Sequence, residues 1–416
     1  MSTNTTFMLT AARLLDGSVA APLEGGAVLL DGGRIAAVGR AADIVTPDAG
    51  RVDYGDATIL PGLVDSHTHL VSPGDGTAGD DTAAEDDQIL LLRAVKNLRT
   101  ILHSGVTTVR DNGAKHRVAF SLREGLRRGL IAGPRVSICG RPITMTGGHM
   151  WYFGSEADGE DGVRAEVRTL LKEGADYIKI VASGGSTRTS NWKRPSYTVP
   201  ELAAMTDEAH RQGKITAAHC ACAASIENCL DAHLDMIIHC VFTEADGSYR
   251  PRQDLVARLA TAQVWVNPTL HILRAAIRHF TSLKERQGSL PAHQEWLLEW
   301  TKGELEHRVE AVGRMIKAGV KIVAGSDSPW NVYAAGGFAH EIEMMAEAGM
   351  SNGEAIVAGT SLAAESIGLG DVAGRLAVGR EADVLVVAGD PLKDLAQLRH
   401  ILDVYQAGRR VERGVA

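Results

Sequence analysis

The sequence lacks three features that define large classes of protein. No segment stays apolar for the roughly 18 residues of a transmembrane helix, and the N-terminus lacks the basic and apolar regions of a secretory signal. The formal net charge of −8 is spread along 416 residues, with no basic block that would follow a phosphate backbone. These absences argue against membrane and nucleic-acid partners, and we expect a soluble cytoplasmic protein.

The chain also lacks a disulfide framework and a zinc-knuckle pattern. Its five cysteines are an odd number, and their spacing does not form paired CxxC motifs. We expect them to be small buried thiols in a reducing compartment. Hydrophobic residues make up 45% of the chain and charged residues 23%, which indicates folded globular domains rather than disorder.

What the middle of the chain does contain is a regular alternation of two patterns. Eight short runs rich in β-branched residues are each followed by a stretch with helical periodicity. This alternation predicts an α/β fold, and eight units over about 250 residues match a closed (β/α)8 TIM barrel. A doubly wound open sheet is the alternative, although no GxGxxG follows the first run. The predicted strands lie at 64–69, 107–113, 134–140, 177–183, 214–220, 236–240, 264–270 and 321–327.

Helical periodicity is clearest in three segments, residues 85–105, 198–213 and 338–350. The second segment begins with Thr198 and Glu201, which stand at the spacing of a capping box. A glycine or another turn signal follows each segment before the next predicted element.

The two ends of the chain differ from the middle. Residues 6–60 and 371–411 both have the pattern of short strands and turns, and neither segment is long enough to form a core alone. We expect both termini to form one small β-sandwich beside the barrel. The predicted domains are therefore 1–60 plus 366–416 for the β-sandwich and 61–365 for the barrel.

Polar residues occur where the predicted strands end. In a βα barrel these C-terminal ends form the functional face, and side chains two apart on a strand point the same way. Taken singly, each residue fits a structural histidine, a turn aspartate or an edge lysine. Together at one face they favour a metal site with the ligands His67, His69, Lys179, His219, His239 and Asp327.

Lys179 is the most informative of these residues. Its ammonium group would be costly to bury within YIKIV, and a cation repels metal ions. A neutral lysine, however, reacts with carbon dioxide to give an anionic carbamate that can bridge two cations. Imidazoles suit zinc, and carboxylate oxygens also suit manganese or cobalt. We therefore expect two divalent metal ions, with zinc as the first choice, and carbon dioxide as the source of the bridge.

The motif PGLVDSHTH at 61–69, the strand-end histidines and GREADVLVV at 379–387 resemble the amidohydrolase superfamily. The resemblance lies with its imidazolonepropionase-like and dipeptidase-like branch and spans nearly the whole chain. It implies that His67, His69 and Asp327 hold the more buried metal. It also implies that carboxylated Lys179 bridges to a second metal held by His219 and His239. Imidazolonepropionases resemble this barrel but use one metal without the lysine, so Lys179 favours the binuclear, dipeptidase-like side.

The predicted reaction is hydrolysis of an amide bond in an N-acyl amino acid, a dipeptide or a related xenobiotic amide or carbamate. Two metals would turn a bridging water into hydroxide near neutral pH and polarise the carbonyl. Asp327 would accept the proton of that water and pass it to the leaving nitrogen. Two alternatives remain: hydrolysis of a cyclic amide, lactam or ester, and a non-catalytic barrel protein. The last predicts substituted ligands, and the sequence shows none.

Substrate contacts are expected from loops at the same face. His149 follows the third strand and is a candidate for contacting the substrate carbonyl or a carboxylate, with a structural loop histidine as the alternative. The loop after the fourth strand would place cations and an aromatic ring near the substrate, although such charges are usually solvated. By analogy with related barrels we expect a homo-oligomer that binds a small-molecule substrate. The loop residues concerned are Arg188, Trp192, Lys193 and Arg194.

Overall fold

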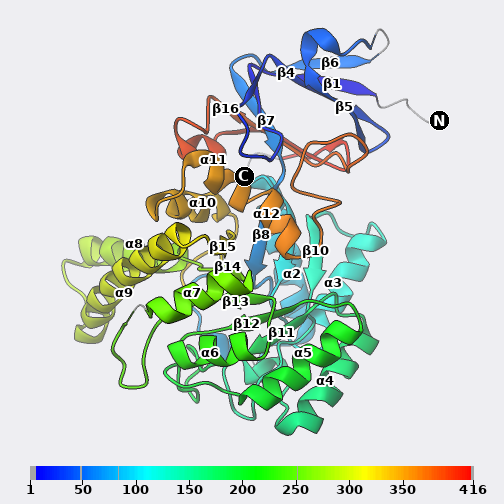
Figure 1. Ribbon diagram of the computed structural model, residues 1–416. Coiled ribbons are helices and arrows are strands. Elements are labelled where there is room, and N and C mark those ends of the chain that lie inside the picture. Colours follow the sequence, from blue (N-terminus) through cyan, green and yellow to red (C-terminus); the bar gives the residue numbers. More distant parts are fainter. Residues whose placement is uncertain (1–5, 47–48, 83, 251, 414–416) are drawn as a thin grey trace.

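The computed structural model describes residues 6–46, 49–82, 84–250 and 252–413 (Figure 1). Residues 1–5 and 414–416 of the predicted terminal domain, and residue 83 of the segment after the first strand, lie outside the described residues. Figure 1 shows a larger α/β part built from the middle of the chain and a smaller β part that contains the blue N-terminal strands. The red C-terminal segment belongs to this smaller part and lies beside the blue strands, on the side that faces the larger part.

Eight parallel strands carry the larger part, and each lies within or overlaps one predicted run. They form two sheets with the orders β10-β9-β8 and β11-β12-β13-β14-β15. Isolated parallel bridges join the edges of these sheets, Ile143 with Ile180 and Thr68 with Ser328. All residues of β8, β9, β11 and β12 are buried, as expected for parallel strands covered on both faces. The strands are β8 (Leu63–Thr68), β9 (Val106–Asp111), β10 (Arg135–Ile138), β11 (Ile178–Val181), β12 (Thr216–His219), β13 (Met236–Ile238), β14 (Trp265–Asn267) and β15 (Lys321–Ile322).

Helices follow most of these strands and cover them with apolar faces. The three clearest helical predictions correspond to α2, α5 and α10. At the start of α5, the carboxylate of Glu201 accepts the backbone N–H of Thr198 at 2.9 Å, as in the predicted capping box. No helix of the described residues combines the length and the apolar character that crossing a membrane requires. The helices are α1 (Gly79–Thr82), α2 (Asp87–His103), α3 (Val118–Arg127), α4 (Gly159–Glu173), α5 (Val199–Arg211), α6 (Ala223–Asp231), α7 (Gln253–Ala262), α10 (Phe338–Glu347), α11 (Asn352–Ala358) and α12 (Ser361–Ser366).

Two long helices stand between β14 and β15. The helices α8 (His271–Gln287) and α9 (Ala292–Lys317) pack against each other and form a hairpin at one side of the larger part (Figure 1). In α8 only His271 is fully buried, whereas α9 buries residues such as Leu298, Leu305 and Val312. The segment between the seventh and eighth predicted strands is therefore a helical hairpin, of which α9 is the more deeply packed helix.

The smaller part joins the two chain ends in one sheet. The C-terminal strand β16 (Val384–Ala388) pairs antiparallel with β7 (Ala57–Pro61). The second sheet, with the order β5-β4-β1-β6, shares a buried apolar cluster with this one. The remaining strands are β1 (Phe7–Thr10), β2 (Arg13–Leu14), β3 (Leu23–Glu24), β4 (Gly26–Asp31), β5 (Arg34–Arg40), β6 (Gly50–Asp53), β17 (Ile401–Gln406) and β18 (Arg409–Arg410).

The smaller part also sets where the first parallel strand begins. Only Gly62 separates β7 from β8. A Cβ at Gly62 would lie 2.2 Å from the side chain of Thr107 on β9, so no larger residue fits between these strands. This close packing fixes the start of β8 and, four and six residues later, the positions of His67 and His69.

Candidate active site

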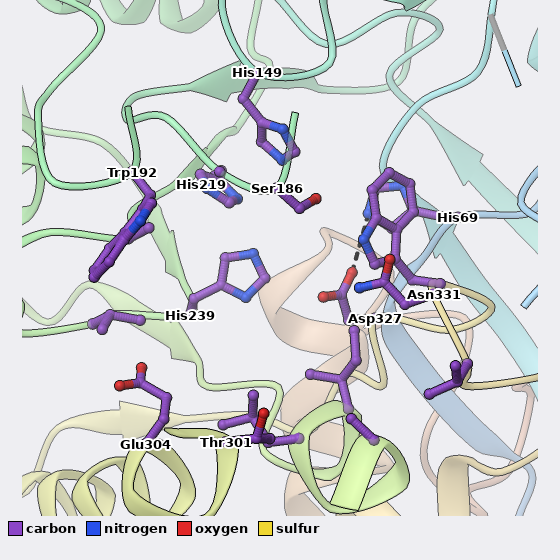
Figure 2. A pocket seen from close by; sticks show the side chains of 18 of the residues that line it. His69, His149, Ser186, Trp192, His219, His239, Thr301, Glu304, Asp327 and Asn331 are labelled. Carbon is purple, nitrogen blue, oxygen red and sulfur yellow. Dashed lines mark ion pairs between the residues drawn. The ribbon is translucent and has the colours of Figure 1, made fainter. Parts of the chain in front are cut away.

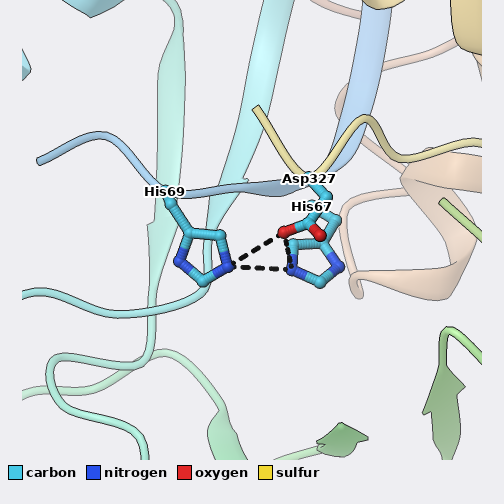
Figure 3. Close-up of side chains that lie close together, drawn as sticks. All are labelled: His67, His69 and Asp327. Carbon is cyan, nitrogen blue, oxygen red and sulfur yellow. Dashed lines mark hydrogen bonds and ion pairs between the residues drawn. The ribbon is translucent and has the colours of Figure 1, made fainter. Parts of the chain in front are cut away.

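Three of the predicted ligands meet at the end of β8. The Oδ1 atom of Asp327 lies 3.3 Å from Nε2 of His67 and 3.1 Å from Nε2 of His69, and the two Nε2 atoms are 3.2 Å apart (Figure 3). Asp327 follows β15, and its backbone N–H donates to the carbonyl of His67 at 2.8 Å. The chain adopts a φ of 58° at Asp327, which is unusual for a residue with a side chain. The strained backbone aims the carboxylate at both imidazoles.

Buried polar neighbours fix this group. Nδ1 of His67 lies 3.0 Å from Oδ1 of Asn267 on β14, and the side-chain amide of Asn267 donates to the carbonyl of Val323 at 3.2 Å. Since that amide oxygen only accepts, Nδ1 of His67 carries the proton and Nε2 keeps its lone pair. The carboxylate of Asp65 accepts the backbone N–H of Ser326 at 2.9 Å, which ties β8 to the segment that carries Asp327. The first and last parallel strands are thus held in register at the site.

The protonation states suit a metal ion at this point. Burial, and then the charge of Lys179, hold the pKa of His67 well below its usual value, so its imidazole is neutral. A neutral imidazole and a carboxylate are the forms that bind divalent metals. The ligand atoms of His67, His69 and Asp327 all lie within 4.8 Å of one another. The residues present therefore fit one metal ion.

The remaining three predicted ligands lie on the neighbouring strands. Lys179 is in β11 and 1% exposed, His219 ends β12, and His239 follows β13. The rings of His219 and His239 are 4.6 Å apart between centroids, and the ring of His239 is 5.5 Å from that of His67. His239 has a φ of 65°, a second strained position at the strand ends. The two groups of ligands therefore lie side by side.

Hydrogen bonds orient these two histidines. Nε2 of His219 lies 3.1 Å from the carbonyl of Gly184 and can only donate to it, which leaves the lone pair on Nδ1. Nδ1 of His239 lies 2.7 Å from Oγ1 of Thr269, so its Nε2 is the atom available to the cavity. Burial lowers the pKa of both imidazoles well below the usual value. Both are neutral, which is the form of imidazole that binds divalent metals.

The ammonium of Lys179 is destabilised by its surroundings. Burial, and then the charge of Arg110, lower the pKa of Lys179 to about 7. Arg110 is fully buried on β9 and donates from Nε to the carbonyl of Ser66 at 2.8 Å. A substantial fraction of Lys179 is therefore a neutral, nucleophilic amine near neutral pH.

His149 faces these ligands from the loop after β10. Its ring is 4.7 Å from that of His219 and 6.5 Å from that of Trp330, measured between centroids. Burial lowers the pKa of His149 to about 3, so the ring is neutral. The hydroxyl of Thr187 accepts the backbone N–H of Met150 at 3.1 Å and lies 2.8 Å from Nδ1 of His149. The Thr187 hydroxyl therefore holds both the ring and the backbone of this histidine loop in place.

The six predicted metal ligands and His149 line one cavity of about 490 Å³ (Figure 2). Figure 2 shows the imidazoles of His69, His149 and His239 and the carboxylate of Asp327 directed toward a common space. Trp330 lies against His69 with its ring centroid 4.7 Å away. The predicted residues that line the cavity are His67, His69, His149, Lys179, Trp192, His219, His239 and Asp327.

The three predicted loop cations do not line this cavity. Arg188 pairs with Asp81 at 3.1 Å, and both side chains are more than half exposed. The ammonium of Lys193 lies 5.7 Å from the ring centroid of Trp192. The cavity lining does not include Arg194. Of the residues predicted in this loop, the structure brings only Trp192 to the site.

Sequence reasoning missed the cavity wall formed by the α8–α9 hairpin. Phe280 of α8 and Trp300, Glu304 and Arg308 of α9 line the cavity. The three α9 residues are four apart, so they share one helical face, and this spacing was the available signal. Trp300 also lies close to an aromatic residue of the loop after β11. Its ring lies 6.3 Å from that of Trp192 across the cavity mouth.

Comparisons with known proteins agree with this geometry. Residues 58–411 match the Amidohydrolase family. Ochratoxinase from Aspergillus niger is 28% identical over 421 residues, covering 90% of this chain and 79% of that protein. A shorter match, 31% over 113 residues, links 21% of this chain to 28% of imidazolonepropionase from Paracoccus denitrificans.

Solved structures show the same fold. The crystal structure of a Xaa-Pro dipeptidase with bound methionine in its active site has a TM-score of 0.84 and 25% sequence identity. The match covers 98% of this chain and 100% of the dipeptidase. Since the family match spans far more than half of the chain, this protein belongs to the amidohydrolase family and is a hydrolytic enzyme.

Proposed function

We propose that the protein is a binuclear metal-dependent hydrolase that cleaves an amide bond in an N-acyl amino acid, a dipeptide or a related xenobiotic amide or carbamate. The observation that carries this proposal is the convergence of His67, His69 and Asp327, whose ligand atoms lie within 4.8 Å of one another, beside Lys179 and further histidines in one cavity. Such a cluster of neutral imidazoles and one carboxylate suits hydrolytic metal chemistry.

We infer that the eight parallel strands form one closed (β/α)8 barrel. The bridges Ile143–Ile180 and Thr68–Ser328 join both pairs of sheet edges, which supports closure. The paired terminal strands would form the β-sandwich domain, residues 1–60 plus 366–416, with the barrel at 61–365. This arrangement explains why residues from β8, β11, β12, β13 and β15 reach one cavity.

The ligand set would divide into two groups. His67, His69 and Asp327 would hold one divalent metal, and His219 and His239 would hold the other. The neutral amine of Lys179 would attack carbon dioxide and release one proton, which leaves an anionic carbamate as the bridge. Zinc is the metal that this mixture of nitrogen and oxygen ligands suits best.

Bound metals would supply Lewis acidity toward the carbonyl oxygen and an acidified water. Side chains of the protein would transfer the protons and stabilise the developing charge. Asp327 would accept the proton of the attacking water and donate it to the leaving nitrogen. His149 would donate a hydrogen bond to the carbonyl oxygen as negative charge develops there. Trp330 and Trp192 would exclude water from the reacting bond.

The comparisons support an amide rather than an ester or lactam. Ochratoxinase aligns over most of this chain, and the Xaa-Pro dipeptidase structure aligns over nearly all of it. The matches to imidazolonepropionases cover between 13% and 41% of the chain. Cyclic amides, lactams and esters remain the second candidate class, and we place them below linear amides.

A substrate screen tests the function. We expect purified enzyme to hydrolyse N-acyl amino acids or dipeptides, to lose this activity after chelation, and to regain it with zinc and bicarbonate. Activity that survives complete removal of metal would contradict the proposal. Hydrolysis of cyclic imides or esters alone would move the protein to the second class.

The cytoplasmic location and the homo-oligomeric state stay predictions. Small molecules are the expected ligands, since the cavity has a volume of about 490 Å³ and is lined by loops and by the α8–α9 hairpin. Size-exclusion chromatography with light scattering measures the oligomeric state directly.

A further inference from the structure

The α8–α9 hairpin contributes one wall of the cavity, and most of this wall is apolar. Phe280 and Leu273 come from α8, and Leu297 and Trp300 come from α9. Trp192 of the loop after β11 completes an aromatic group at the same end. An apolar wall beside a polar reaction centre suits the hydrocarbon part of a small substrate.

One charged pair interrupts this wall. Nε of Arg308 donates to Oε1 of Glu304 at 2.8 Å, and the two side chains are 16% and 10% exposed. The same helix carries a second pair at the same i,i+4 spacing, Glu310 with Arg314, whose side chains are 54% and 39% exposed. Charges on the cavity side of α9 are costly to desolvate. The nearly buried inner pair, Glu304–Arg308, therefore calls for a functional explanation, whereas the exposed outer pair, Glu310–Arg314, does not.

The guanidinium of Arg308 has donors to spare. An arginine side chain carries five N–H donors in a planar fork, and in the described residues the hydrogen bond to Glu304 involves only Nε. The two terminal nitrogens are therefore available to form the paired contacts that a carboxylate accepts. Among the described residues that line the cavity, Arg308 and Lys179 alone are lysine or arginine, and Lys179 is assigned to the metal bridge.

Arg308 lies on the same cavity as the predicted metal ligands. The cavity lining includes Arg308 together with His219 and His239. Figure 2 shows Glu304 and Trp192 on the far side of His239 from Asp327. A group bound at Arg308 would thus lie next to the reacting bond and beside the aromatic wall.

We propose that Arg308, held in place by Glu304, binds a carboxylate of the substrate while Trp192, Phe280 and Trp300 contact an adjacent apolar side chain. This inference rests on the proposed function and narrows its substrate class. The enzyme would prefer amides in which one half is an amino acid with a free carboxylate and an apolar side chain. Neutral amides and carbamates would be poor substrates.

The experiment uses two substrates that differ only in the carboxylate, N-acetyl-L-phenylalanine and N-acetyl-2-phenylethylamine. We expect the wild-type enzyme to favour the first in kcat/KM. The Arg308→Gln variant should lower kcat/KM for the first by about 10- to 100-fold, mainly through KM, because a charged hydrogen-bonded pair is lost. Its effect on the second should be less than about threefold. Arg314→Gln, which breaks the outer pair of the same helix, is the matched control and should change neither.

A double variant controls for misfolding of the Arg308→Gln protein. Arg308→Gln leaves Glu304 nearly buried without its partner, whereas Glu304→Gln with Arg308→Gln removes both charges. The double variant should fold and show the same selective loss. An equal loss for both substrates, or a wild-type enzyme that does not distinguish them, would overturn the inference. Better turnover of cationic substrates by Arg308→Gln would instead assign the site to Glu304 and would also overturn it.

A binding measurement separates this inference from the proposed function. Calorimetric titration with 3-phenylpropionate and 3-phenyl-1-propanol needs no amide bond. We expect Arg308→Gln to weaken binding of the carboxylate by about 10- to 100-fold and to leave the alcohol unchanged. If no amide is hydrolysed but this difference is seen, the reaction is wrongly assigned and the carboxylate site stands. If amides are hydrolysed and the difference is missing, the reaction stands and the carboxylate site fails.

Discussion

The two sides of the cavity are built in different ways. On one side, histidines, a lysine and an aspartate stand at the ends of parallel strands, fixed by buried hydrogen bonds and by strained backbone at His239 and Asp327. On the other side, the α8–α9 hairpin presents aromatic residues and one ion pair from helical faces. The comparison suggests that the strand ends carry the chemistry and the hairpin selects the substrate. Changes to the first side should affect kcat and metal content, and changes to the second should affect KM.

The largest expected effect is on the strand-end side. Asp327→Asn should lower kcat by at least about 10²- to 10⁴-fold, since it removes both a proton acceptor and an anionic ligand atom. Circular dichroism and thermal unfolding should show an intact fold. Asp371→Asn, at an exposed position, is the control and should keep full activity. Near wild-type turnover by a folded Asp327→Asn protein would remove this residue from the mechanism.

Lys179 tests whether the strand-end side needs a bridge. Lys179→Met should lower kcat/KM by about 100-fold or more, because a bridging anion and one metal would be lost. Lys179→Glu places a carboxylate near the same position and should recover part of the activity. Because the pKa of Lys179 is lowered to about 7, the amine is increasingly neutral above that pH. At an equal concentration of dissolved carbon dioxide, recovery of chelated wild-type enzyme with zinc should therefore be faster at pH 8 than at pH 6. Equal recovery rates would argue against carbamate formation.

The hairpin side should respond differently. Trp300→Ala should raise KM for aromatic N-acyl amino acids by about tenfold, the effect of losing part of an apolar contact. Its metal content and its kcat should stay within about twofold of wild type. Trp296→Ala is the matched control, since Trp296 lies one turn earlier on α9, is 66% exposed and does not line the cavity. A large fall in kcat for Trp300→Ala would contradict the assignment of the hairpin to substrate selection alone.

The smallest effect concerns how the hairpin is anchored. The carboxylate of Glu341 on α10 accepts the backbone N–H groups of Leu270 and His271 at the start of α8, and burial raises the pKa of Glu341 to about 8. A raised pKa means that folding favours the protonated acid. Protonated Glu341 therefore makes its full contribution to the free energy of unfolding at a pH below the usual glutamate pKa. As the pH rises toward 8, the free energy of unfolding falls by at most about 1.4 kcal/mol per pH unit.

Glu341→Gln should remove this slope. Urea unfolding between pH 5 and 8 should then show a flatter stability profile for the variant than for the wild type, and the two should differ least in slope below pH 5. Parallel profiles over the whole range would show that Glu341 is ionised in the folded protein at neutral pH.

The strand-end side was predictable because its geometry follows from local rules. Alternation along a strand, and the meeting of strand ends at one edge, bring His67, His69, His219, His239 and Asp327 together without knowledge of the loops. The structure adds neighbours that no spacing rule indicates, such as Asn267 and Thr187, because hydrogen-bond partners are set by how separate segments pack.

The hairpin side was not predictable in the same way. The charges of Arg188 and Lys193 were expected at the cavity because they follow β11 in sequence, yet the loop turns Arg188 toward Asp81 instead. Arg308 lies far from any strand end in sequence and reaches the cavity because α9 packs with one face inward. Which face of a long helix points inward depends on tertiary packing, and α9 has polar residues on several faces.

The most direct test of the central claim is a count of metals and carbon dioxide on the intact protein. Native mass spectrometry of wild-type enzyme, loaded with zinc in bicarbonate buffer, should show two zinc ions and one carbon dioxide adduct per chain. Lys179→Met should show no adduct and at most one zinc. A wild-type protein that binds a single zinc without the adduct, or that matches Lys179→Met, would contradict the binuclear site.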